Sequence, residues 1–196
     1  GYAGEITIGG ESLSEINEAD LMKHGVLVRH NSYLFKGTVE ENLRMAKPDA
    51  TKEEMEAVLQ KVNLLGFLQT QDGLQTQLLE KASNLSGGQC QRLVIARALL
   101  RTDSAVYIFD EAASNIDVES EELIMNVIHE LAKTKTVLLI SHRLANVVKS
   151  DKIYFLKDGE IKESGKHDEL MSQNGAYRHL YESQMALENY GKGGVA

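Results

Sequence analysis

Residues 85–92 have the sequence Leu-Ser-Gly-Gly-Gln-Cys-Gln-Arg and stand directly before a segment with helical spacing. A small hydroxyl residue followed by two glycines lets backbone N–H groups come close to an anion. The helix predicted to start near Gly88 adds a partial positive charge at this point. Ser86, Gly87, Gly88 and Gln89 are therefore candidate phosphate ligands. A Ser/Gly-rich loop that only caps a helix has the same composition, so this motif alone leaves both interpretations open.

A second candidate site lies at the end of an apolar run. Residues 105–109 are continuously apolar and lead into Asp110 and Glu111. Such a run without polar alternation predicts a central strand that is buried on both faces. An acid at the carboxyl end of that strand is well placed to hold Mg²⁺ beside nucleotide phosphates, and the next carboxylate can deprotonate a water. The alternative interpretation is that Asp110 and Glu111 only begin a solvated loop.

Buried strands alternate with helices along the chain, which predicts an α/β fold with a largely parallel sheet. Strands are expected at residues 5–8, 25–29, 105–109 and 136–140, with a hairpin at 153–161. The all-helical stretch 48–88 indicates an inserted helical subdomain. The expected organisation is a partial core in residues 1–47, the helical subdomain in 48–88, further core in 89–166, and a helical segment with a tail in 167–196.

Composition narrows the function classes. The chain has 196 residues, a formal net charge of −8 and a single cysteine. It is long enough to bury a core without a disulfide or metal, and one cysteine forms no internal disulfide. The acidic balance argues against a nucleic-acid partner, whose binding proteins are usually basic. No stretch approaches the roughly 18 apolar residues that cross a bilayer, so we expect any membrane process to be served from the water side.

Four motifs together resemble those of the ATP-binding cassette (ABC) ATPases. Residues 85–89 resemble the signature loop, and 106–111 resemble the Walker B strand with its catalytic carboxylate. Residues 114–117 (Ser-Asn-Ile-Asp) are similar to the D-loop. His142, after the strand expected at 136–140, is similar to the switch histidine. The order and spacing of all four match, which makes the resemblance far more specific than any single motif.

The resemblance covers nearly the whole chain and extends to exporter-type cassettes. Residues 34–43 resemble the segment after the exporter Q-loop, and Thr76 with Glu80 and Lys81 resembles the exporter loop that touches the coupling helices. The fold implied is a P-loop NTPase (RecA-like) core with a helical subdomain. Tyr33, next to the segment 34–43, belongs to an apolar cluster that fits either the core or a groove for a coupling helix.

The resemblance also implies a site and its partners. Glu111 corresponds to the general base, Asp110 to the Mg²⁺-associated acid and His142 to a γ-phosphate contact. Residues 86–89, with Asp117 of the D-loop, face the ATP of a second nucleotide-binding domain packed head to tail. The cofactors implied are ATP and Mg²⁺. A transmembrane domain of the same or a partner polypeptide completes an exporter, which places the domain at the cytoplasmic face of the cell membrane.

Two departures from the family pattern stand out. The chain contains no P-loop of the form G-x-x-x-x-G-K-[ST]; its Gly-Lys pairs at 165–166 and 191–192 are not followed by Ser or Thr. In the family the P-loop precedes the strand expected at 5–8, so we interpret the chain as a piece of a longer polypeptide and expect it to be inactive alone. The second departure is His30, which stands at the position of the Q-loop glutamine.

Three other functions remain as alternatives. A regulatory cassette that does not hydrolyse ATP is favoured by His30. The ATPase head of a chromosome-maintenance (SMC) or DNA-repair protein also has a signature loop, but its Q-loop lies across a long coiled coil from the signature. Here His30 and Ser86 share one short span without heptads. A translation-associated cassette does not require the exporter-like segments.

Overall fold

The computed structural model describes residues 4–114 and 116–192, without the side chains of 189–192. Asn115 of the expected D-loop and most of the expected tail (193–196) lie outside the described residues. The chain divides into two compact units, Gly1–Leu138 and Leu139–Ala196, and each is described by itself. Within the described part of the chain, no helix is both long and apolar enough to cross a membrane.

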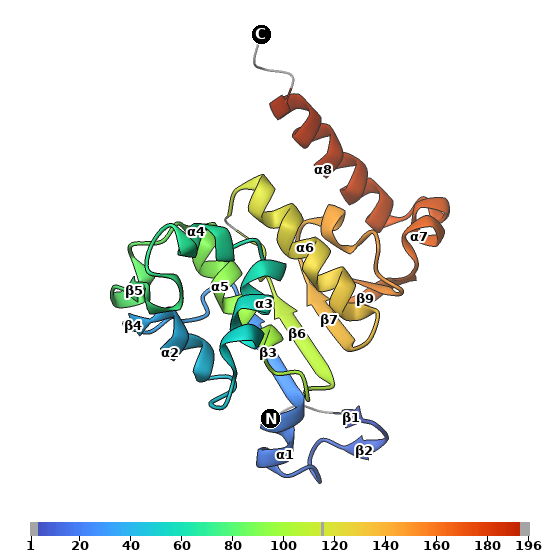
Figure 1. The fold of residues 1–196 in the computed structure, drawn as a ribbon. Helices are drawn as coiled ribbons and strands as arrows, with labels where there is room; N and C mark the ends of the chain where they lie inside the picture. Colours follow the sequence, from blue (N-terminus) through green and yellow to red (C-terminus); the bar gives the residue numbers. More distant parts are fainter. Residues whose placement is uncertain (1–3, 115, 193–196) are drawn as a thin grey trace. The chain divides into compact units, whose positions relative to one another are not determined.

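A three-stranded sheet has the strand order β3-β6-β7 (Figure 1). Strand β3 (Gly25–Arg29) pairs in parallel with β6 (Val106–Asp110), and β7 is Thr136–Ile140. The helices α5 (Gly87–Leu99) and α6 (Val118–Ala132) contact each other, and α5 packs against β3. The predicted α/β fold with a parallel sheet is confirmed.

The two faces of this sheet differ in burial. Tyr107 and Phe109 are buried, with 1% exposure each, but Ile108 between them is only half-buried. On the neighbouring strand β3, Leu27 is 50% exposed. The prediction that residues 105–109 form a strand buried on both faces is therefore wrong. Successive side chains of a strand point to opposite faces, and the described chain covers one of these faces more completely.

The chain before this sheet forms short elements. Strands β1 (Thr7–Ile8) and β2 (Glu11–Ser12) make an antiparallel hairpin, so the strand expected at 5–8 is shorter than predicted. Gly9 and Gly10 turn the hairpin with φ of 63° and 91°, which glycine adopts without steric cost. Helix α1 (Glu18–His24) follows and was not predicted.

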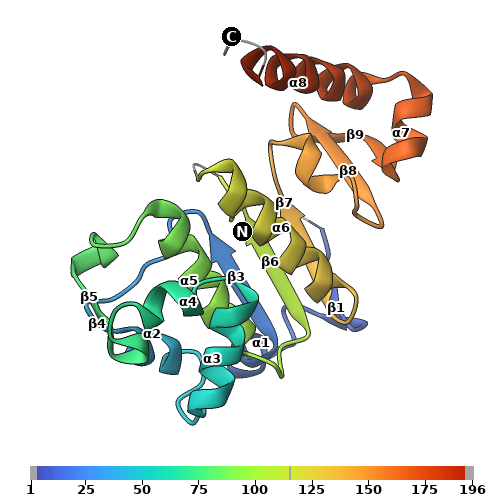
Figure 2. The same ribbon diagram turned by 45° about the horizontal axis from the view of Figure 1, so that its top comes forward.

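The segment between β3 and α5 is mainly helical and gathers beside α5 (Figure 2). Its elements are β4 (Gly37–Thr38), α2 (Val39–Arg44), α3 (Lys52–Lys61), α4 (Leu65–Gln69), the 3₁₀ turn Gly73–Gln75, β5 (Gln77–Leu78) and the 3₁₀ turn Glu80–Ala82. Thr51 caps α3 through the predicted box with Glu54. Strand β5 pairs with β4, so the stretch 48–88 is not all-helical and its packing begins before residue 48. The four-part domain division stays a prediction.

The second unit is built around a hairpin. Strands β8 (Ile153–Lys157) and β9 (Glu160–Gly165) pair antiparallel, as predicted, around Asp158 and Gly159 with φ of 54° and 77°. The other elements are the 3₁₀ turn η3 (Leu144–Val147), α7 (His167–Gln173) and α8 (Ala176–Lys192). Their core contains Leu144, Val147, Ile153, Leu170 and Tyr177.

Candidate nucleotide site

The carboxyl ends of β3 and β6 bring two predicted site residues together. The backbone N–H of His30 donates to the carbonyl of Asp110 over 3.2 Å. Arg29, paired with Asp110 in the sheet register, places its Nε 4.0 Å from the Asp110 carboxylate. These side chains are 58% and 40% exposed, so the ion pair is weak. The residues predicted at the Q-loop and Walker B positions, far apart in the sequence, are therefore neighbours at one sheet edge.

Glu111 directly follows β6 in an unusual backbone conformation. Its φ is 50°, in the left-handed region that residues other than glycine rarely adopt. The carbonyl of Glu111 accepts the Ser114 N–H over 3.0 Å and the Ser114 hydroxyl over 2.9 Å, which holds the turn. Such conformations cost about 1–3 kcal/mol and concentrate at functional sites. The sequence contains no signal for this turn, because glutamate has no preference for it.

Ser86 and Gln89 form a capping box at the start of α5. The Ser86 hydroxyl accepts the Gln89 backbone N–H over 3.2 Å, and the Gln89 side-chain carbonyl accepts the Ser86 N–H over 2.8 Å. Both residues thus do what the capping interpretation requires. The arrangement also keeps Ser86 and Gly87 exposed at a helix amino end. The two interpretations of this motif are therefore compatible.

The two signature glycines lie in different surroundings. A Cβ on Gly88 would lie 2.5 Å from the Ser120 hydroxyl and 2.8 Å from the Asp117 carboxylate, but a Cβ on Gly87 would meet nothing within 4 Å. Gly88 is buried and lets the start of α5 approach the start of α6. Gly87 leaves an open approach to the backbone. The two glycines are equivalent in the sequence, because only the packing distinguishes them.

We expect Gly88→Ala to destabilise the fold by about 1–3 kcal/mol, since its methyl group overlaps Ser120 and Asp117. Gly87→Ala is the matched control and should change stability by less than about 1 kcal/mol. Urea unfolding followed by circular dichroism measures both. Equal stabilities for the two variants would contradict the close approach of α5 and α6.

Asp117 is the N-cap of α6. Its carboxylate accepts the Ser120 backbone N–H over 2.8 Å. This bond is the largest cause that holds the pKa of Asp117 below its usual value, and a hydrogen bond with the Ser120 side chain is the next. The stabilisation is therefore present at neutral pH and is lost as the pH falls through the lowered pKa. The Asp117 cap at the start of α6 and the close approach of Gly88 therefore bring the end of the expected D-loop next to the start of α5.

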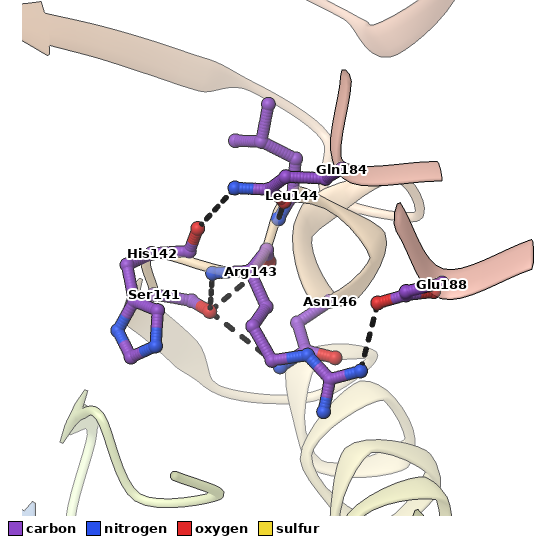
Figure 3. Close-up of polar contacts among 7 residues, drawn as sticks. All are labelled: Ser141, His142, Arg143, Leu144, Asn146, Gln184 and Glu188. Carbon is purple, nitrogen blue, oxygen red and sulfur yellow. Dashed lines mark hydrogen bonds and ion pairs between the residues drawn. The ribbon is translucent and has the colours of Figure 1, made fainter. Parts of the chain in front are cut away.

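His142 belongs to the second unit, directly after β7 and Ser141. Its carbonyl accepts the side-chain amide N–H of Gln184 over 2.8 Å (Figure 3). The other end of that amide accepts the backbone N–H of Leu144 over 2.9 Å. The side chain of His142 is exposed. Nothing in the sequence indicates a role for Gln184, because it lies on α8, far along the chain from every motif.

The family is established by comparison with known proteins. The family model described as "ABC transporter" matches residues 1–114. The chain belongs to the ABC transporter family. The resemblance of the chain to this family, inferred from its motifs, is thus confirmed, and the roles of the individual motif residues stay predictions.

Relatives and solved structures agree with this ABC assignment. The chain is 49% identical over 185 residues to an uncharacterized ABC transporter ATP-binding protein of Haemophilus influenzae, covering 94% of this chain and 33% of that protein. It is 41% identical over 183 residues to the ATP-dependent lipid A-core flippase of Mannheimia succiniciproducens, covering 92% and 31%. A bacterial Atm1-family ABC exporter solved with ATP bound matches with a TM-score of 0.86 and 29% identity, covering 93% and 32%. The chain thus spans about a third of the length of these ABC proteins.

The carboxylates of Asp110 and Glu111 in this ABC chain fit a metal site that is completed by a nucleotide. Among residues 4–114 and 116–192, no group of three or more His, Cys, Asp or Glu side chains is placed to hold a metal ion. Mg²⁺ in nucleotide sites is usually held by one or two carboxylates together with phosphate oxygens and waters. The Asp110 carboxylate at the end of β6 is such a donor, with Glu111 next to it. These residues fit Mg²⁺ that a nucleotide brings.

Next to His30 the ABC chain exposes two aromatic rings. Tyr33 and Phe35 are 43% and 47% exposed and contact each other edge to face at 4.8 Å between centroids. Leu34 between them is buried, so the cluster is divided between core and surface. The Arg97 guanidinium donates to the Tyr33 carbonyl over 2.9 Å and fixes this segment against α5. Phe35 also lines a cavity of about 660 Å³ together with Met45.

Proposed function

We propose that this chain is part of the ATP-hydrolysing domain of an exporter-type ABC transporter, located at the cytoplasmic face of the cell membrane. The observation that carries the proposal is the edge of the sheet, where His30 lies against Asp110 and Glu111 makes a strained turn. In such folds, nucleotide phosphates bind at the carboxyl ends of the strands, where Asp110 and Glu111 lie.

The proposed reaction is hydrolysis of the γ-phosphate of ATP. The oxygen of a water forms a bond to the γ-phosphorus in line with the bond to ADP that breaks. Glu111 takes the proton of that water as general base. His142 contacts the γ-phosphate, and Asp110 holds Mg²⁺. When bound, Mg²⁺ neutralises charge on the phosphate oxygens.

The signature residues are proposed to act on the ATP of a second nucleotide-binding domain. Gly87 is exposed, with open space around it, so a phosphate carried by another subunit has room to reach the amino end of α5. Residues 86–89, with Asp117 of the D-loop at the same surface, form the contact. The chain has no G-x-x-x-x-G-K-[ST] sequence to cradle phosphates itself. We therefore propose that it hydrolyses no ATP alone.

A transmembrane domain is the second proposed partner. Large exposed apolar patches mark contacts with other proteins, and the exposed rings of Tyr33 and Phe35 can contribute to such a patch. Their position next to His30 links that contact to the Asp110 edge through β3. Movement of a coupling helix against this surface would therefore reach the nucleotide site by a short path. Closure of two such domains around ATP would drive translocation.

His30 makes a regulatory cassette the second candidate function. An imidazole offers one donor or acceptor at each ring nitrogen and reaches less far than a glutamine amide. The structure places its backbone beside Asp110, where a Q-loop glutamine is expected. A cassette with reduced ATP turnover fits a histidine in place of that glutamine.

The proposal is tested by ATP hydrolysis of the intact polypeptide reconstituted in lipid vesicles. We expect His142→Ala to lower turnover by about 10²-fold or more, because it removes a contact to the transferring phosphate. His179→Ala, an exposed histidine on α8, is the control and should retain the parent rate. An intact protein that binds ATP without turnover would favour the regulatory cassette. Full activity of His142→Ala would contradict the proposed site.

A further inference from the structure

We propose that Gln184 on α8 is a positioning residue for His142, an inference that rests on the proposed function of His142 as a phosphate contact. Through this residue, the orientation of the switch histidine depends on the C-terminal helix. The carrying observation is that one side-chain amide bonds the backbone on both sides of Arg143 (Figure 3).

The two bonds of Gln184 require its particular chemistry. Its NH₂ group donates to the His142 carbonyl over 2.8 Å, and its carbonyl oxygen accepts the Leu144 N–H over 2.9 Å. Among side chains of this length, only a carboxamide offers a donor and an acceptor side by side. A carboxylate at this position would turn lone pairs toward the His142 carbonyl. Gln184 therefore fixes the peptide planes that flank Arg143.

The residues on either side of His142 are held by other contacts, and the His142 carbonyl is bonded from α8. The Ser141 hydroxyl accepts the Arg143 N–H over 3.0 Å and lies 3.1 Å from the Arg143 carbonyl. Leu144 is buried in the core of the second unit. The loop is thus held at Ser141 and at Leu144, and Gln184 is the contact from α8 to the backbone of the histidine between them.

Helix α8 is anchored so that it can hold this position. Tyr177 and Tyr181 pack in the same core as Leu144, and Gln184 follows three residues after Tyr181. Residues spaced by three and four lie on one face of a helix. Four residues further along this face, the Glu188 carboxylate pairs with the Arg143 guanidinium over 2.8 Å. One helix face therefore contacts three consecutive residues of the switch loop.

The experiment uses Gln184→Ala, Gln184→Met and Gln184→Glu in the intact polypeptide. Glu182→Ala is the matched control, because the Glu182 carboxylate bonds Arg178 on its own helix. Steady-state phosphate release over a range of ATP concentrations is measured in the parent and in the His142→Ala background. We expect each Gln184 variant to lower kcat by about five- to 50-fold with little change in KM for ATP. In the His142→Ala background the same variants should cost no further activity.

Hydrogen exchange supplies a readout that does not depend on turnover. Loss of the acceptor in Gln184→Ala and Gln184→Met should speed exchange at the Leu144 amide, and Glu182→Ala should not. Equal losses in both backgrounds would show a general structural role and overturn the inference. So would parent activity of all three variants while His142→Ala is impaired. Full activity of His142→Ala would instead remove the proposed function, and the inference with it.

Discussion

Replacing Glu111 by glutamine in the intact polypeptide should slow ATP turnover by about 10²–10⁴-fold, the usual contribution of a positioned general base. Glutamine keeps the size of the side chain but does not accept a proton from water. ATP binding should survive, because the backbone turn with φ of 50° and its two bonds from Ser114 do not involve the carboxylate. Steady-state hydrolysis and equilibrium binding of ATP measure the two effects separately.

Glu122→Gln is the control for this substitution, since Glu122 is exposed on α6 and the same chemical change is made there. It should retain parent turnover. Thermal unfolding of both variants checks that Glu111→Gln acts on chemistry and not on folding. Hydrolysis by Glu111→Gln at the parent rate would show that Glu111 is not the base of a working site.

Gly87→Asp should abolish ATP-driven closure of two subunits and reduce ATP hydrolysis to background. The new side chain has space within its own subunit, because nothing lies within 4 Å of a Cβ at Gly87. Its effect therefore falls on whatever approaches this surface. It adds bulk at the open end of α5 and a negative charge that repels phosphate. Binding of ATP by the intact polypeptide that carries the substitution should persist.

Gly66→Asp is the matched control, because Gly66 also has open space around its Cβ position and lies exposed on α4. It should change neither closure nor hydrolysis. ATP binding and dimer formation are measured separately, by calorimetry and by light scattering in detergent. If Gly87→Asp abolished ATP binding by the subunit that carries it, the site would lie within one chain and the head-to-tail model would be wrong.

Local signals in the sequence predicted the elements that local interactions form. Residues 25–29 form a strand with the predicted bounds, and Asp158-Gly159 turns the predicted hairpin. The Thr51–Glu54 box caps α3, because its hydrogen bonds join residues three apart. The strand expected at 105–109 lies one residue later and includes Asp110. Burial was less predictable, since it depends on what covers each face of the sheet.

The candidate site shows the same division. The motif residues, their order and their family were recognisable from the chain alone, because phosphate chemistry requires particular residue types at fixed spacing. Their packing was not. Gly87 and Gly88 are identical neighbours in the sequence, yet only Gly88 is closed in by Ser120 and Asp117. The strained φ of Glu111 is likewise set by the turn with Ser114 and not by the preference of a glutamate.

Residue identity and spacing along this chain indicate the α/β alternation, helix caps such as the Thr51–Glu54 box, and the family, and they predict the signature, Walker B and switch positions. Only tertiary structure brings His30 against Asp110, separates the roles of the two signature glycines and places Gln184 on the loop of His142. The physical reason is the separation along the sequence of the residues that interact. Caps and turns join residues a few positions apart, so a short sequence encodes them. Contacts across a sheet edge or from a distant helix depend on how the whole chain packs.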